Sequence, residues 1–259
     1  MAIRDEDMTQ RTELLAYIDE LLDVAAFDDY APNGLQVAGR AEIGKIVGGV
    51  TACQALVDAA VAQGADTLLV HHGYFWKGED PRVVGMKQRR LKTLLEADIN
   101  LLAYHLPLDA HPELGNNAQL ARQMGWRVTG TFGESRGPAI GQWGELPAPQ
   151  TAAELSAALA EKLGRPPLHI GDAGAEIRTL AWCSGAAQGY LEQAAVLGLD
   201  AFVSGEISEP TVHEARELGI HYFSAGHHAT ERGGVQALGA HLAQHFGLEF
   251  AFIDIDNPV

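Results

Sequence analysis

Histidines and carboxylates in this sequence follow the ends of apolar runs. His71 and His72 directly follow the run at residues 67–70, and His105 and Asp109 follow a second run at residues 99–104. An imidazole that leaves water needs a partner for its nitrogens, because an unpaired buried polar group costs on the order of a few kcal/mol. These positions therefore mark places where a metal ion, a ligand or a hydrogen-bond partner is expected.

Two further polar groups follow apolar runs in the second half of the chain. Glu206 ends one such run, and His227 precedes an expected helix at residues 231–245. His227 and Glu231 are four residues apart, so their side chains share one face if the helix begins near His227. Such a pair alone is usually only a solvated helix start. Because the pair follows a predicted strand, it is a candidate for metal binding or catalysis.

Strands and helices alternate through the first half and would bring such groups together. The order of the elements predicts parallel strands joined by crossover helices. Ligands bind at the carboxyl ends of strands in such sheets, and the polar groups lie at those ends. Strands are expected at residues 45–50, 67–70 and 99–104, and helices at 55–63, 86–97 and 116–124.

The second half repeats this pattern weakly. Residues 178–206 align with residues 45–73, and each segment carries a strand, a helix, a Gly-x-Asp turn and a second apolar strand. Glu206 falls at the place of His72. Duplication would explain the match, and so would the general pattern of strand–helix–strand units. The expected fold class is α/β, with two related α/β halves that have mainly parallel sheets flanked by helices and a metal site in the cleft between them.

A segment rich in Gly and Pro separates the halves. Residues 128–149 predict a short antiparallel or irregular insert. The next helix, expected at residues 151–163, begins with Thr151 and Glu154 at the spacing of a capping box. We expect a first domain made of residues 1–126 with 222–259, and a second domain made of residues 127–221.

Five side chains form a candidate metal site: His71, His72, Asp109, His227 and Glu231. Imidazoles and carboxylates without neighbouring Lys or Arg suit divalent ions such as Zn, Fe, Mn, Co or Ni. Five ligands exceed the needs of one tetrahedral ion. Adjacent side chains of a strand point to opposite faces, so His71 and His72 would each hold one of two ions. A bridging Glu231 would allow a separation of about 3.5 to 4 Å between the ions.

Simpler interpretations stay open for these residues. The two strand-end histidines could be a solvent-facing pair, or one could be a core histidine bonded to a carbonyl. Asp109 could be a turn or cap residue, because two prolines predict an exposed, rigid loop without a helix at residues 105–112. His105 suits a group that orients Asp109.

Composition excludes several classes of protein. The 259 residues include 18 Lys and Arg against 34 Asp and Glu, a formal net charge of −16. Nucleic-acid binding is therefore not expected, since it would need the basic residues of 86–97 to gather on one face. Cys53 and Cys183 form no CxxC pair, which excludes a zinc knot and disfavours a disulfide framework. No apolar stretch reaches the roughly 20 residues that span a bilayer, and the acidic residues 1–7 do not resemble a secretory signal. We expect a cytoplasmic protein.

Four motifs occur in a specific order and spacing. They are Asn33-Gly34-Leu35-Gln36-Val37, then His71-His72-Gly73 with Tyr74-Phe75-Trp76-Lys77-Gly78, then His105-Leu106-Pro107-Leu108-Asp109, and finally Gly226-His227-His228-Ala229-Thr230-Glu231. Together they resemble the GTP cyclohydrolase I type 2 homologue family, also called the Nif-three-like family. The resemblance spans residues 30–257, and the short middle insert resembles the compact bacterial branch.

This resemblance implies a two-domain α/β subunit, a dinuclear metal site in the cleft and a toroidal homohexamer. Carried over by motif, His72 and Asp109 would hold one ion, His71 and His227 would hold the other, and Glu231 would bridge them. The same likeness implies that the motif at residues 33–37 lies near the site.

The expected function is that of a dinuclear metal-dependent hydrolase acting on a small nucleotide or purine-like ring. Glu206 and His105 are the candidates for proton transfer. The aromatic residues 74–76 would either stack on a base or pack at a subunit contact. The alternative is a non-catalytic, ring-shaped metal-binding scaffold that regulates its partners. Open positions for water on the ions would favour the enzyme, because structural sites are closed.

Overall fold

The structure, a computed structural model, describes residues 8–134 and 137–259. The chain forms two compact units. Unit 1 takes the described residues up to Leu108 together with Gly234–Asp256, and unit 2 takes Asp109–Gly233 with Asn257–Val259. Residues 1–7, whose acidic side chains disfavour a secretory signal, lie outside the described residues. Residues 135–136 of the predicted insert also lie outside them.

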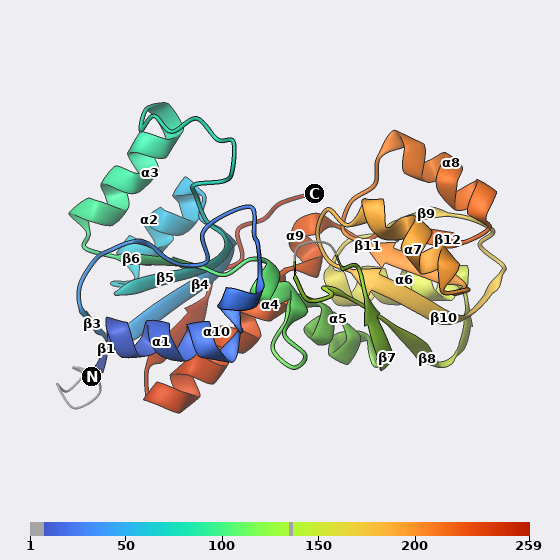
Figure 1. Cartoon of the computed structure of the whole chain (residues 1–259), viewed down its shortest axis with the longest axis horizontal. Coiled ribbons are helices and arrows are strands. Elements are labelled where there is room, and N and C mark those ends of the chain that lie inside the picture. Colours follow the sequence, from blue (N-terminus) through green and yellow to red (C-terminus); the bar gives the residue numbers. More distant parts are fainter. Residues whose placement is uncertain (1–7, 135–136) are drawn as a thin grey trace. The chain divides into compact units, whose positions relative to one another are not determined.

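Unit 1 is built around a sheet that, within the described residues, has five strands in the order β13-β4-β5-β6-β2. Strands β13, β4, β5 and β6 run parallel, and β2 is antiparallel to β6. Figure 1 shows α2 and α3 over one face of this sheet and α1 and α10 over the other. The elements are β1 (Thr9–Gln10), α1 (Arg11–Leu21), β2 (Gly34–Val37), β3 (Glu42–Ile43), β4 (Lys45–Thr51), α2 (Gln54–Ala62), β5 (Thr67–His72), α3 (Gly85–Glu96), β6 (Asn100–Ala103), α10 (Arg232–Phe246) and β13 (Glu249–Phe252).

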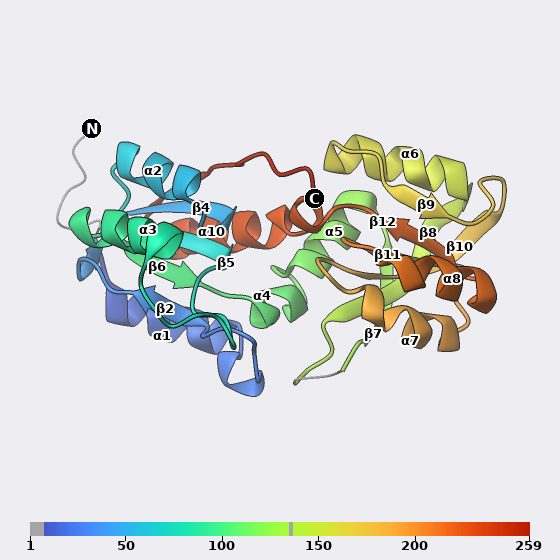
Figure 2. The same cartoon turned by 90° about the horizontal axis from the view of Figure 1, so that it is seen from above.

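Unit 2 contains a mixed sheet that, in the described part of the chain, has six strands in the order β7-β8-β10-β11-β12-β9. Only the pairs β10–β11 and β11–β12 are parallel. Figure 2 shows α6 on one side of this sheet and α7 and α8 on the other. The elements are α5 (Asn116–Met124), β7 (Arg127–Phe132), β8 (Gly141–Thr151), α6 (Ala152–Leu163), β9 (Leu168–Ile170), β10 (Glu176–Cys183), α7 (Leu191–Val196), β11 (Ala201–Ser204), α8 (Glu209–Leu218), β12 (His221–Ser224) and α9 (His227–Thr230).

Apolar side chains on the inner faces of the helices explain how each sheet is covered. Leu56 of α2 and Leu94 of α3 pack with Leu68 of β5 in one buried cluster of unit 1. In unit 2, Leu155 of α6 packs with Trp182 of β10 in a second cluster. Burial of such a side chain contributes roughly 1.5–3 kcal/mol. These clusters hold the strands, and the strand ends carry the predicted polar groups.

The two units share one strand–helix–strand plan. Asp66 of unit 1 accepts hydrogen bonds at Oδ2 from the peptide N–H groups of Gly44 and Lys45, each at 2.9 Å. Asp200 of unit 2 accepts at Oδ2 from the peptide N–H groups of Arg178 and Thr179, also at 2.9 Å. Each aspartate closes the Gly-x-Asp turn onto the start of the preceding strand. The prediction of two α/β halves is confirmed. The expectation of mainly parallel sheets holds for unit 1 and is wrong for unit 2, where three of the five strand pairs given for the described residues are antiparallel.

The domain bounds differ from the expected ones. Strand β12 pairs in register with β11, and Leu120 of α5 belongs to the buried cluster of α6 and β10. Both elements therefore belong to unit 2, although the sequence analysis places residues 1–126 and 222–259 in the first domain. The first break falls after Leu108 and the second after Gly233.

Other local predictions are confirmed or corrected. Thr151 and Glu154 form the predicted capping box at the start of α6, and the insert forms the antiparallel pair β7–β8. The predicted exposed loop at residues 105–112 is wrong, because Leu106–Ala110 form a helix, α4. Pro107 stands in its first turn, where a peptide N–H has no partner within the helix, so the proline is tolerated. Among the described residues, no helix has the length and apolar character needed to span a membrane.

Candidate metal centre

Three histidines of unit 1 gather their ring nitrogens at the carboxyl ends of neighbouring strands. One ligand atom from each of His71, His72 and His105 lies within 4.8 Å of the other two. His71 and His72 end β5, and His105 follows the parallel neighbour β6. The ring centroids of His71 and His72 are 4.7 Å apart, and those of His71 and His105 are 5.1 Å apart. His71 is fully buried.

Hydrogen bonds fix which nitrogen of two of these rings offers a lone pair. Nδ1 of His71 lies 2.9 Å from the carbonyl oxygen of Tyr104. A carbonyl only accepts, so Nδ1 donates and Nε2 keeps its lone pair. The core histidine bonded to a carbonyl, one of the simpler interpretations, thus describes Nδ1 of His71. Nδ1 of His105 lies 2.7 Å from Oδ1 of Asp29, so Nδ1 donates and Nε2 carries the lone pair of this ring.

Asp29 organises the loop around His105. Its Oδ1 also accepts from the peptide N–H of Tyr30 at 2.6 Å, and its Oδ2 accepts from Nδ2 of Asn33 and the peptide N–H of Leu106, both at 2.9 Å. Burial alone would raise the pKa of Asp29, but the hydrogen bond and charge of His105, with the donors of Asn33 and Tyr30, lower it to about 2. Asp29 is therefore an anion that orients His105.

The motif at residues 33–37 supports both histidine segments. Oδ1 of Asn33 accepts from the peptide N–H of His105 at 2.7 Å, and Oε1 of Gln36 accepts from the peptide N–H of Tyr74 at 2.6 Å. Asn33 and Gln36 therefore hold the two chain segments that follow β5 and β6. This agrees with the placement that the resemblance implied.

The aromatic residues 74–76 separate into different environments. The ring of Trp76 lies 5.1 Å from that of His105 and 5.9 Å from that of His72. Tyr74 is buried, and its hydroxyl donates to the carbonyl of Ala52 at 2.7 Å. Phe75 is exposed, with Nζ of Lys87 at 5.0 Å from its ring centroid. Trp76 is the member of this group that lies beside the imidazoles.

Unit 2 places His227 between two carboxylates. Its Nδ1 lies 2.7 Å from Oε1 of Glu206, and its Nε2 lies 3.1 Å from Oε2 of Glu231. The predicted proximity of His227 and Glu231 is confirmed by this contact, although α9 begins at His227 and ends at Thr230, so that Glu231 stands between α9 and α10. Burial would lower the pKa of His227, but hydrogen bonds and charge from Glu231 and then Glu206 raise it to about 9. Glu206 follows β11, the parallel neighbour of the strand that leads to His227.

Asp109 is held by two side-chain donors. Its Oδ1 accepts from Nδ2 of Asn116 at 2.8 Å and from Oγ of Ser184 at 3.1 Å. Asp109 and Ser184 are 6% and 7% exposed, so the carboxylate is not the exposed turn residue of the simpler interpretation. Burial raises the pKa of the neighbouring Cys183 thiol, and the charges of Asp109 and Glu231 raise it further. The region is thus rich in negative charge.

The backbone of Gly185 borders the carboxylate of Glu231. A Cβ at this position would lie 2.2 Å from Oε1 of Glu231 and 3.2 Å from Nε2 of His227. The carbonyl of Gly185 accepts from the peptide N–H groups of Gly205 at 2.9 Å and Glu206 at 3.1 Å. This glycine also has φ +66°, which disfavours a side chain. Glu231 therefore packs against a fixed backbone.

The predicted residues thus fall into two sets with suitable chemistry. Unit 1 brings His71, His72 and His105 together, and unit 2 brings His227, Glu231 and Glu206 together. Imidazole nitrogens and carboxylate oxygens are the ligands that Zn, Fe, Mn, Co and Ni accept in proteins. These groups fit a divalent metal ion.

Four supporting residues were missed by the sequence interpretation: Asp29, Asn116, Ser184 and Gly185. Ser184 and Gly185 follow β10 directly, so the rule applied to the other strand ends would have found them. Asp29 lies four residues before Asn33 in a segment without periodic apolar residues. The expectation that no Lys or Arg lies near the site is wrong, because the side chain of Arg165 packs against Gly226, the residue before His227.

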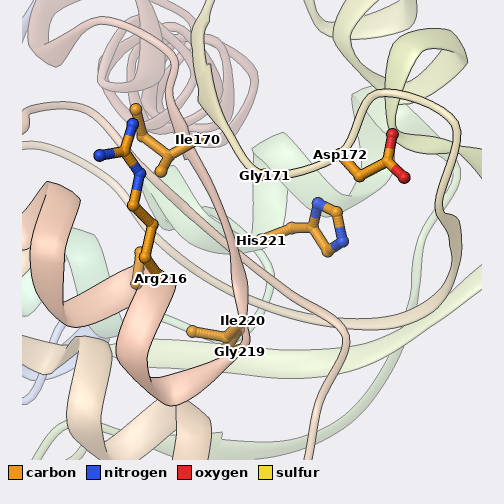
Figure 3. A pocket seen from close by; sticks show the side chains of 8 residues that line it. Ile170, Gly171, Asp172, Arg216, Gly219, Ile220 and His221 are labelled. Carbon is orange, nitrogen blue, oxygen red and sulfur yellow. The ribbon is translucent and has the colours of Figure 1, made fainter.

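Unit 2 also has a pocket that contains none of the predicted site residues. Its volume is about 260 Å³. It lies at His221, where β12 begins, whereas His227 follows the end of that strand. Figure 3 shows Arg216 and Asp172 on opposite sides of this pocket. It is therefore separate from the cluster around His227.

Comparisons with known proteins cover nearly the whole chain. Residues 9–258 match the model of the family described as Duf34/NIF3 (NGG1p interacting factor 3). A protein of Pseudomonas aeruginosa named GTP cyclohydrolase 1 type 2 homolog is 58% identical over 245 residues, which are 95% of this chain and 97% of that protein. A protein of the same name from Escherichia coli K12 is 54% identical over 250 residues, 96% of this chain and 99% of that protein.

Solved structures agree with these sequence relatives. The structure titled protein ybgI, unknown function, has a TM-score of 0.93 and 54% identity, and the match covers 97% of this chain and all of that one. The structure of TTHA1606 from Thermus thermophilus has a TM-score of 0.87 and 36% identity, with the same coverage. The resemblance of the four motifs is thereby confirmed, and the chain belongs to the Duf34/NIF3 family.

Proposed function

We propose that this protein is a dinuclear metal-dependent hydrolase that acts on a small nucleotide or purine-like ring. The observation that carries the proposal is the cluster of three imidazoles in unit 1, whose ligand atoms lie within 4.8 Å of one another. Imidazole nitrogens gathered in this way are suitable ligands for a divalent ion. In this proposal His71, His72, Asp109, His227 and Glu231 would hold two divalent ions, with Glu231 as the ligand common to both.

The hydrogen bonds that orient these side chains support metal binding. Nδ1 of His71 donates to a carbonyl, and Oδ1 of Asp109 is held by Asn116 and Ser184. Outer hydrogen bonds of this kind orient metal ligands and set the tautomer of a ligating histidine.

Bound ions would supply Lewis acidity and would lower the pKa of a bound water toward about 7. The remaining roles belong to the side chains. His105 accepts a proton at Nε2, and Asp29 stabilises the resulting imidazolium through Nδ1. Glu206 holds the ring of His227 and is the second candidate for proton transfer. Trp76 offers its ring to a purine beside His72 and His105.

Metal analysis combined with a hydrolysis screen tests this function. The purified protein is expected to carry about two divalent ions per chain and to hydrolyse a nucleotide or nucleobase in a reaction that a chelator stops and added metal restores. Glu231→Gln should abolish turnover. Glu209→Gln, which changes an exposed carboxylate of α8 in the same unit, should retain it. Metal that binds without turnover across the screen would favour the non-catalytic scaffold instead.

We also propose that the chain assembles into a toroidal homohexamer, as the family resemblance implies. Sedimentation velocity should then show one species made of six 27.7 kDa chains. A monomer or dimer at micromolar concentration would contradict this assembly.

A further inference from the structure

Arg165 lies against the backbone that precedes His227 in unit 2. Its side chain fills the place where a side chain of Gly226 would stand: Nη1, Cδ and Cζ lie 2.5, 2.7 and 3.1 Å from the ideal Cβ position. The peptide N–H of Gly226 is bound to the carbonyl of Gly205 at 2.9 Å, so this backbone is fixed. The guanidinium therefore sits beside the turn that presents His227.

This guanidinium has a buried donor without an acceptor. Nη1 of Arg165 is shielded from solvent and has no hydrogen-bond partner among the described residues. The carboxylates of Glu206 and Glu231, which follow the same strand ends, are bound to His227 instead. A shielded N–H donor without an acceptor costs free energy. The chain has 34 acidic residues against 18 basic ones, so a carboxylate partner would have been easy to supply.

We propose that Arg165 binds the phosphate group of a nucleotide substrate beside the metal centre. The planar fork of a guanidinium matches phosphate oxygens in a bidentate manner. Arg165 as a whole is half-buried, and an oxygen of a phosphate that reaches this guanidinium would supply the acceptor that Nη1 lacks. The inference rests on the proposed function, which supplies the nucleotide substrate. It adds that the protein recognises the phosphate group of that nucleotide and not the base alone.

Calorimetric titration of the full chain with adenosine 5′-monophosphate and with adenosine tests this role. Each titration is made on metal-free and on zinc-loaded protein. The wild-type protein should prefer the monophosphate, and Arg165→Met should weaken its binding roughly 10- to 100-fold while adenosine binding and zinc content stay unchanged. Arg165→Lys should fall between the two. The control Arg178→Met removes an exposed arginine of the same unit that pairs with Glu176, and it should bind as the wild type does.

Three outcomes would overturn the proposal. These are equal wild-type affinity for the monophosphate and adenosine, an equal loss for both in Arg165→Met, and wild-type affinity for the monophosphate in Arg165→Lys. The last comparison applies even where Arg165→Met does not fold. The titrations of metal-free protein test phosphate binding by Arg165 independently of the proposed metal-dependent hydrolysis. A phosphate preference that depends on Arg165 supports this assignment even where the hydrolysis screen finds no turnover.

Discussion

Asn116 donates a 2.8 Å hydrogen bond from Nδ2 to Oδ1 of Asp109, and both side chains are buried in unit 2. Ser184 donates to the same oxygen at 3.1 Å. Two donors on one oxygen fix the plane of the carboxylate, and they lower the cost of keeping its charge away from water. The pair therefore prepares Asp109 before any ligand arrives.

Loss of one of these donors should weaken metal binding. We expect Ser184→Ala to lower zinc affinity roughly tenfold or more, because the change of a group that orients a metal ligand typically costs about 10- to 100-fold. Competition with a chromophoric chelator measures this affinity. Ser208→Ala, which removes a serine bonded to Thr211 at the start of α8, is the matched control. Equal affinities in both variants would separate Ser184 from metal binding.

An added methyl group at Gly185 should displace the carboxylate of Glu231. The new Cβ of Gly185→Ala would lie 2.2 Å from Oε1 of that carboxylate, so we expect a larger loss of zinc affinity than in Ser184→Ala. Gly198→Ala is the control, because Gly198 has φ +70° but open space around its Cβ position. It carries the same backbone strain without the clash. Similar zinc affinities for the two glycine variants would contradict the role of this contact.

The charge of Asp29 should make stability depend on pH in the acid range. Its pKa in the folded chain is about 2, below the ordinary value of 3.8, so the folded state binds the proton less tightly than the unfolded state does. The resulting stabilisation, about 2 kcal/mol, is fully present above pH 4–5 and is lost as the pH falls toward 2. Urea denaturation of wild type and Asp29→Asn should show a gap at pH 6 that closes near pH 2. A gap that stays constant over this range would exclude the linkage.

Each aspartate of the Gly-x-Asp turns should stabilise its own unit. Asp66→Ala removes three hydrogen bonds, one of them from Arg40, and Asp200→Ala also removes three, one of them from the Thr179 hydroxyl. We expect losses on the order of 2 to 4 kcal/mol for each variant. Hydrogen exchange should rise in β4 and β5 for the first variant and in β10 and β11 for the second. Each variant serves as the control for the other. Faster exchange in the wrong unit would contradict this assignment.

The sequence predicted most of the scaffold because apolar runs and helix periods report directly on burial. The helix at residues 116–124 is found at those bounds, and β5 extends only as far as the histidines that follow the predicted run. Helix α4 was missed because two prolines in residues 105–112 were interpreted as breakers. The position of Pro107 in the first turn depends on where the helix begins, and spacing alone does not show this.

The residues that orient the site were harder to predict than its candidate ligands. His71, His72 and His227 stand at strand ends, which apolar runs reveal. Asp29 acts through contacts with His105, a residue 76 positions away, and a contact at that distance leaves no local pattern. Arg165 reaches Gly226 in the same manner. Such partners follow from the fold and not from any segment alone.

The paired contacts of Asp66 and Asp200 show which parts of each half are free to diverge. The aspartate binds peptide N–H groups, so these hydrogen bonds do not depend on the side chains of the strand residues that supply them. The side chains at the ends of the strands can therefore differ between the two halves while the hydrogen bonds of Asp66 and Asp200 stay the same. In the alignment of the two halves, His72 and Glu206 fall at equivalent positions after equivalent aspartates, so the same local architecture presents an imidazole in one half and a carboxylate in the other.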